Sequence, residues 1–186
     1  MIQDWRNQWR QGNFPFLFAQ IASYTATPHE SWGALRDAQR RSLFLTNTGM
    51  AVTMDVGEAH NIHPADKQTV GERLALQARS IAYGENITAN GPLFRLAYPD
   101  HAAMHIWFDY ADGLKSQGPL QGFEIAGSDG NFLPATATIE GNTVIATNPT
   151  IPTPRYVRYA WPNFPQANLN NAANLPASTF TTYTAP

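Results

Sequence analysis

Two histidines and three acidic residues lie together in one polar stretch, Asp55–Lys67, which reads DVGEAHNIHPADK. A short apolar run precedes it and a helix-like pattern follows it, so it joins a predicted strand to a predicted helix. In α/β proteins, catalytic groups collect at the carboxyl ends of parallel strands. A histidine can take up a proton near neutral pH, and it does so best when a carboxylate orients its ring. His63 is therefore a candidate general base, with Asp55, Glu58 and Asp66 as candidate acids.

Two other interpretations of this stretch stay open. One is an ordinary polar turn that ends in a helix cap at Asp66. The other is a metal site, because His60 and His63 have HxxH spacing, although a proline follows His63 and the stretch has no helical pattern. A second pair, His101 and His105, lies on a strand-like run, where partial burial is the expected role. We expect no metal site and no cofactor.

A serine hydrolase also needs a nucleophilic serine. None of the serines has the Gly-x-Ser-x-Gly setting between a strand and a helix, and Ser128, in AGSDG, is expected in a turn. The residues therefore offer a base and an acid without a nucleophile. The serines considered are Ser23, Ser31, Ser42, Ser80, Ser116, Ser128 and Ser178.

Composition narrows the class of protein. The chain has 186 residues, of which 43% are hydrophobic and 14% are charged, as expected for a folded chain with a core. A net charge of −2 favours neither nucleic acid nor an anionic membrane as a partner. The absence of cysteine excludes disulfides, thiolate zinc sites and a cysteine nucleophile. No apolar run approaches the roughly 18 residues that a membrane helix needs.

The first half of the chain alternates between helical and strand-like patterns. The order α-β-α-β-α predicts parallel strands joined by helical crossovers. Arg36, Arg40 and Arg41 are expected on a solvated helix face. The predicted elements are a helix over 1–11, a strand buried on both faces over 14–22, a helix over 31–45, a strand over 50–56 and a helix over 66–84.

Two features predict that further sequence precedes this one. Two strands make a poor parallel sheet, because both faces and at least one edge need partners. The chain also opens inside an amphipathic helix, with Trp5 and Trp9 expected to be buried and without the apolar segment of a signal peptide.

The second half changes character after Asn90-Gly91-Pro92, where helical periodicity ends. Seven short apolar runs follow, separated by turn residues, and Glu140–Asn142 is a hairpin signal. The pattern predicts an antiparallel β-sandwich over 89–186, after an α/β domain over 1–88. The runs are LFRLAY, MHIWFDY, LQGFEIA, LPATATI, NTVIAT, RYVRYAW and STFTTY.

Several longer motifs carry a family resemblance. NIHPADK followed by VGERLAL, and VRYAWPNFP followed by LPASTF, are the most specific of them. Together with WGALRDAQ and GFEIAGSDGNF, they resemble the C-terminal part of a sialate O-acetylesterase, an SGNH-type serine esterase that removes acetyl groups from sugars. The resemblance implies the C-terminal portion of a flavodoxin-like SGNH domain over 1–88, followed by the β-sandwich.

The resemblance also implies site residues and partners. It places the triad histidine on His63, while the serine and the oxyanion hole come from upstream, in the missing N-terminal half of the same enzyme. Many SGNH hydrolases have an aspartate three residues before this histidine; here His60 stands there, so Glu58 is the first choice of acid and Asp55 the second. The implied substrate is an acetylated sugar or glycan. The full-length bacterial enzyme is expected in the periplasm or outside the cell, and this chain alone is expected to be inactive.

A different class of function is also open. The β-rich half could be a carbohydrate-binding module, or a structural module, with aromatic residues that dock sugar rings or simply fill its core. Aromatic residues on strands are more often core. The candidates are Trp107, Tyr110, Tyr159 and Trp161.

Overall fold

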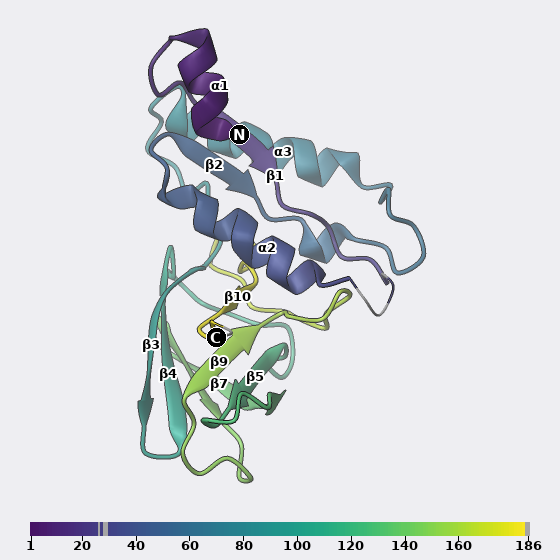
Figure 1. The fold of residues 1–186 in the computed structure, drawn as a ribbon, viewed down its shortest axis with the longest axis vertical. Helices are drawn as coiled ribbons and strands as arrows, with labels where there is room; N and C mark the ends of the chain where they lie inside the picture. The colour runs from purple at the N-terminus through teal and green to yellow at the C-terminus, as the bar shows by residue number, and fades with distance from the viewer. Residues whose placement is uncertain (26, 28–29, 185–186) are drawn as a thin grey trace.

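The computed structural model describes residues 1–25, 27 and 30–184. The first half contains a parallel strand pair, β1 with β2, in register from Phe16↔Thr48 to Ala19↔Ala51. The parallel prediction is therefore confirmed. Helix α3 packs against this pair, and α2 lies between the pair and the β-rich part of the chain (Figure 1). The elements are α1 (Ile2–Trp9), β1 (Phe16–Ala19), α2 (Trp32–Arg41), η1 (Ser42–Phe44), β2 (Thr48–Ala51), η2 (Met54–Val56) and α3 (Lys67–Ile81).

Both strands differ from their predicted form. β1 is shorter than predicted and is not buried on both faces: Phe16 and Phe18 are half-buried and Ala19 is exposed. The reason is that Phe16, Phe18 and Ala19 line an open apolar groove on one side of the strand. Among the described residues, β1 also has a strand partner on one edge only. β2 ends at Ala51, and the chain then turns through the short 3₁₀ helix η2. The predicted strand over 50–56 extended through these residues, so its second half is wrong.

The tryptophans of α1 are also placed differently from the prediction. Trp5 and Trp9 are 46% and 63% exposed. Each ring contacts one phenylalanine of the following segment, at centroid distances of 5.6 Å and 5.3 Å, and its other face remains open. The buried side chains of this helix are Ile2 and Arg6.

The second half forms two four-stranded antiparallel sheets, in the orders β3-β4-β8-β7 and β10-β9-β5-β6. Each of the seven predicted runs contains a strand, and LPATATI divides between β6 in one sheet and β7 in the other. The hairpin prediction is confirmed, because Glu140 pairs with Thr143 across a turn at Gly141 with φ 59°. The strands are β3 (Leu93–Asp100), β4 (Ala103–Asp109), β5 (Phe123–Ala126), β6 (Leu133–Pro134), β7 (Thr136–Glu140), β8 (Thr143–Thr147), β9 (Tyr156–Tyr159) and β10 (Phe180–Thr181).

One apolar core runs through both halves. Met50, Val52 and Met54, from β2 and the segment after it, belong to the same buried cluster as residues of both antiparallel sheets. Phe180 lies within this core, stacked on Phe94 at 4.3 Å between ring centroids. The two predicted domains, 1–88 and 89–186, therefore share a core across their boundary, and the division itself stays a prediction.

Arg36 of α2 is the main polar connection between the halves, and its predicted place on a solvated face is wrong. The side chain is 0% exposed. Its guanidinium donates to the carbonyls of Ala160, Pro162 and Asn163 at 2.9, 2.6 and 3.3 Å, and to the Thr179 hydroxyl at 2.9 Å. Burial lowers the pKa of Arg36 to about 10. The helix face looks solvated in sequence because the layer that covers it comes more than 120 residues later.

The neighbouring arginines and a buried glutamine complete this connection. Arg40 and Arg41 both bind Asp37 at 2.7 Å, and the Arg40 side chain is only 14% exposed. Gln20, after β1, donates to the Arg36 carbonyl at 3.0 Å and to the Ser178 hydroxyl at 2.8 Å. Helix α2 is thus hydrogen-bonded both to the segment after β1 and to the β-rich half.

None of the described helices is both long and apolar enough to cross a membrane.

Replacing Arg36 with lysine tests this connection. The change keeps the charge but removes the planar fork that reaches several acceptors. We expect the free energy of unfolding to fall by about 2–4 kcal/mol, because a buried acceptor left without a donor costs roughly 1–3 kcal/mol. Urea unfolding followed by tryptophan fluorescence measures the difference.

The matched control is Arg79→Lys. The Arg79 side chain is 51% exposed and pairs with Glu85 at the surface. We expect its urea midpoint to stay at the wild-type value. Equal losses in the two variants would contradict the role given to Arg36.

Candidate functional site

The histidine-bearing loop leaves the carboxyl end of β2 and leads into α3, as predicted. In Figure 1 it lies at the right-hand end of α3. Asp66 caps α3, with its carboxylate accepting a hydrogen bond from the Thr69 amide at 2.9 Å. That bond lowers the pKa of Asp66 below its ordinary value. Asp66 is therefore the helix cap that one of the two alternatives predicted.

Asp55 holds the start of the loop to α3. Both of its carboxylate oxygens accept hydrogen bonds from the Arg73 guanidinium, at 2.6 and 2.7 Å. The same guanidinium donates to the Val52 carbonyl at 2.7 Å. Arg73 is a residue that sequence reasoning missed; the available signal was its position in the second turn of the helix that follows an acidic loop.

Glu58 closes the loop on itself. One carboxylate oxygen accepts from the Ala65 amide at 2.6 Å, and the other accepts from the Asn61 side chain at 3.3 Å. The side-chain oxygen Oδ1 of Asn61 in turn accepts from the His63 backbone amide at 3.0 Å. Glu58 therefore fixes the backbone on both sides of His63.

The His63 side chain itself is exposed, beside the buried Pro64. Among the described residues, no hydrogen bond joins its ring to Glu58 or Asp55, although both carboxylates lie in the same loop. An exposed imidazole on a closed loop is free to meet a group brought from elsewhere. Which of the two acids orients the ring stays a prediction.

The segment after β1 packs against the loop that carries His63. The Thr25 amide donates to the Ala59 carbonyl at 3.1 Å. Gly57 is in such close contact with the Ser23 backbone that a Cβ atom there would collide with it. Ser23 is buried, and its hydroxyl has no partner among the described residues. These contacts place the His63 loop at the carboxyl ends of both parallel strands.

The other histidines and Ser128 were candidates for a metal site or a nucleophile, and most of them lie at the surface. His60 and His63 are exposed; His105 is half-buried as predicted, whereas His101 is exposed at a turn with φ 52°. Within the described residues, no group of three or more acidic or histidine side chains could hold a metal ion. Ser128 is in a turn, as predicted.

The four aromatic candidates have different environments. Tyr159 is core: it is 0% exposed, its hydroxyl accepts from the Leu169 amide at 2.9 Å, and burial raises its pKa. Trp161 is half-buried near the Arg158 guanidinium. Tyr110 is 50% exposed, and Trp107 is half-buried on the outer side of β4.

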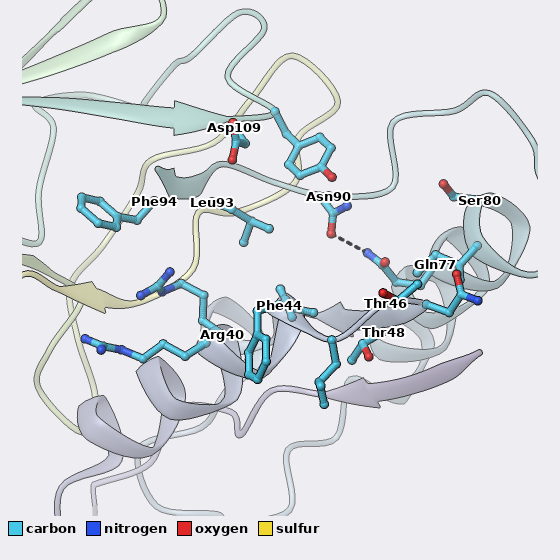
Figure 2. Close-up of a pocket in the computed structure, with 16 residues that line it drawn as sticks. Arg40, Phe44, Thr46, Thr48, Gln77, Ser80, Asn90, Leu93, Phe94 and Asp109 are labelled. Atoms are coloured by element: carbon cyan, nitrogen blue, oxygen red, sulfur yellow. Dashed lines mark hydrogen bonds between the residues drawn. The ribbon is translucent and has the colours of Figure 1, made fainter. Parts of the chain in front are cut away.

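A separate cleft of about 700 Å³ lies at the other end of β2. It runs between α2, η1 and α3 on one side and the start of the β-rich part on the other, as Figure 2 shows. Gln77 and Asn90 are hydrogen-bonded at 3.0 Å in its wall, and Arg40, Phe44 and Asp109 line it (Figure 2). Because Thr48 begins β2 here and the His63 loop follows its other end, this cleft does not contain the candidate base.

Comparisons with known proteins identify related chains. No family model matches. The sialate O-acetylesterase of Mus musculus is 33% identical over 192 residues, covering 89% of this chain and 35% of that protein. The sialate O-acetylesterase of Homo sapiens is 37% identical over 113 residues, covering 50% of this chain and 22% of that protein.

A solved structure extends the similarity to the fold. A carbohydrate acetylesterase from Xanthomonas citri has a TM-score of 0.94 and 41% sequence identity, covering all of this chain and 45% of that one. The chain thus spans about a third of the length of the mouse relative and less than half of the bacterial one. In sequence and in fold, this chain is related to the sialate O-acetylesterases and to a bacterial carbohydrate acetylesterase, and it fits a C-terminal portion of such an enzyme.

Proposed function

We propose that this chain supplies the histidine-bearing part of a serine esterase that hydrolyses O-acetyl esters on sugars. The observation that carries the proposal is His63, exposed on a closed loop at the carboxyl ends of two parallel strands. The names of the relatives support the class of reaction and of substrate. The serine and the oxyanion hole come from outside this chain, in the remainder of a flavodoxin-like SGNH domain.

The proposed chemistry follows from an exposed imidazole. His63 removes the proton of the serine hydroxyl as its oxygen attacks the acetyl carbonyl, and donates it to the departing sugar oxygen. It then removes a proton from water as the water oxygen attacks the acetyl-serine ester, and it returns that proton to the departing serine oxygen, so that acetate is released and the serine hydroxyl is restored. Glu58 is the proposed orienting acid, because it fixes the backbone around His63 through Ala65 and Asn61.

The open edge of β1 is the proposed attachment point for the rest of the sheet. Next to it lies an apolar groove of about 640 Å³, lined by Phe16, Phe18, Leu35 and Phe44 among others. Phe44 is 85% exposed. A parallel sheet needs apolar cover on both faces and a partner at each exposed edge. A strand and helix from the remainder of the enzyme would satisfy both needs.

Co-expression with the unmatched part of the Xanthomonas citri enzyme tests the catalytic role. We expect the assembled pair to hydrolyse a chromogenic acetate, and this chain alone to be inactive. His63→Ala should lower turnover on the order of a millionfold, as loss of a triad member does in other serine hydrolases. His60→Ala is the matched control and should keep most of the activity. Turnover by this chain alone that His63→Ala abolishes would contradict the need for an outside serine.

The choice of acid has its own test in the same assembled pair. We expect Glu58→Gln to lower kcat at least about a hundredfold, the lower end of what an acid–base partner contributes. Asp55→Asn should lower kcat less and should mainly lower the melting temperature, because its carboxylate is engaged by Arg73. The opposite ranking of the two kcat values would assign the acid to Asp55.

Phe44→Asp tests the attachment surface. The change should leave the melting temperature of this chain alone unaltered, since the ring is mostly in solvent. It should reduce recovery of the co-expressed segment at least about tenfold, because a carboxylate would be buried in the joint. Tyr83→Asp, which alters an aromatic residue 77% exposed, is the control and should not reduce recovery. Equal recovery for both variants would place the joint elsewhere.

A further inference from the structure

The outer face of the β3-β4-β8-β7 sheet carries three aromatic rings that the proposed reaction does not use. Met104, Ile106 and Phe108 of β4 are buried in the core, so the alternate residues His105 and Trp107 face outward. Tyr98 pairs with His105 across β3 and β4, and Trp107 is two residues along the same face. We call Tyr98, His105 and Trp107 the aromatic platform.

The three rings lie nearly parallel to one another. Tyr98 is 5.0 Å from Trp107 and 5.6 Å from His105 between ring centroids, at interplanar angles of 19° and 6°. His105 and Trp107 are 6.0 Å apart at 24°. Tyr98 is 47% exposed. Leu96, which pairs with Trp107 across the two strands, is 44% exposed. The three rings are stacked against one another, so each covers part of its neighbour; Tyr98 and Leu96 are the exposed members of this face, and His105 and Trp107 are half-buried beneath them.

The surroundings of the platform are polar and acidic. On the adjacent strand β8, the half-buried Thr143 and Ile145 pair with Trp107 and His105. One strand farther out, on β7, Thr138 and Glu140 are exposed. At the other side, Asp100 contacts His101 at 2.6 Å and His105 at 3.7 Å. Asp109 is balanced by Arg95 at 3.7 Å, so Asp100 and Glu140 leave the rim with excess negative charge.

We propose that the aromatic platform binds a neutral polysaccharide chain. The C–H face of a pyranose ring carries partial positive charge, which complements the negative face of an aromatic ring. The carboxylates and hydroxyls of the rim can accept and donate hydrogen bonds to sugar hydroxyls. An anionic sugar such as a sialate would be repelled by Asp100 and Glu140. This charge balance commits the site to an uncharged glycan.

The platform is separate from the candidate base. In Figure 1, β3 and β4 form the lower left margin of the molecule, whereas the His63 loop lies at the upper right. The site would retain an insoluble or polymeric substrate while esters elsewhere on it are hydrolysed. The inference goes beyond the proposed function and does not rest on it, because binding by this chain requires no serine and no turnover.

Affinity electrophoresis of this chain alone tests the proposal, with a xylan free of uronic acid, or with polysialic acid, cast in the gel. We expect xylan, acetylated or not, to retard the chain, and polysialic acid to leave its mobility unchanged. Trp107→Ala and Tyr98→Ala should each weaken xylan binding at least tenfold, whereas Trp107→Phe should retain most of it. Trp9→Ala removes an exposed tryptophan of α1 and should bind like the wild type.

Melting temperatures measured in parallel identify any variant that fails to fold. If Trp107→Ala fails to fold, Tyr98→Ala still tests the proposal, because the Tyr98 side chain is exposed. Mobility unchanged by xylan, β-glucan and mannan would overturn the proposal, as would retardation that persists in Tyr98→Ala. A dimer in light scattering that Tyr98→Ala dissociates would assign the face to a second copy of the chain. Failure of acetate release in the assembled pair would leave these binding results unaffected.

Discussion

The arrangement of the two halves depends on one buried cation. Arg36 stands on a helix that contacts both the parallel strands and the β-rich part, and its guanidinium is surrounded by backbone carbonyls of the segment after β9. A buried charge without a carboxylate partner is tolerated because these donors and acceptors match closely. The Thr179 hydroxyl accepts from Arg36 and donates to the Ala160 carbonyl, and β10 pairs with β9, so these contacts hold the segments 160–163 and 178–181 and the helix α2 together.

That constraint carries through to the histidine loop. Gln20, which binds the Arg36 carbonyl, also accepts a hydrogen bond from Thr53 at the beginning of the turn after β2. Arg73 then fixes Asp55, and Glu58 fixes the backbone around His63. The His63 imidazole is therefore exposed, while the backbone that carries it is connected to the core through these hydrogen bonds. Such an arrangement would suit the base that we propose, because its loop is fixed while its ring is not held by a hydrogen bond beforehand.

The two halves of the chain expose different kinds of surface. Within the described part of the chain, β1 has a strand partner on one edge only, and an apolar groove lies beside it. The two antiparallel sheets share one core, and the outer face of the β3-β4-β8-β7 sheet carries Tyr98, His105 and Trp107 near the carboxylate of Asp100. The two proposals, a surface that joins the remainder of a hydrolase and a surface that binds a glycan, thus rest on separate faces of the chain.

The sequence by itself determined the local elements and the place of the candidate base. Apolar periodicity predicted parallel strands before position 88 and antiparallel strands after it, and the polar loop between β2 and α3 predicted His63 and the cap at Asp66. These depend on residues close together in the chain. Only the tertiary structure decided that Arg36 is buried, that Trp5 and Trp9 are exposed, and that Asp55 is held by Arg73, because each outcome depends on a layer contributed by residues distant in sequence or on an edge that no described strand covers.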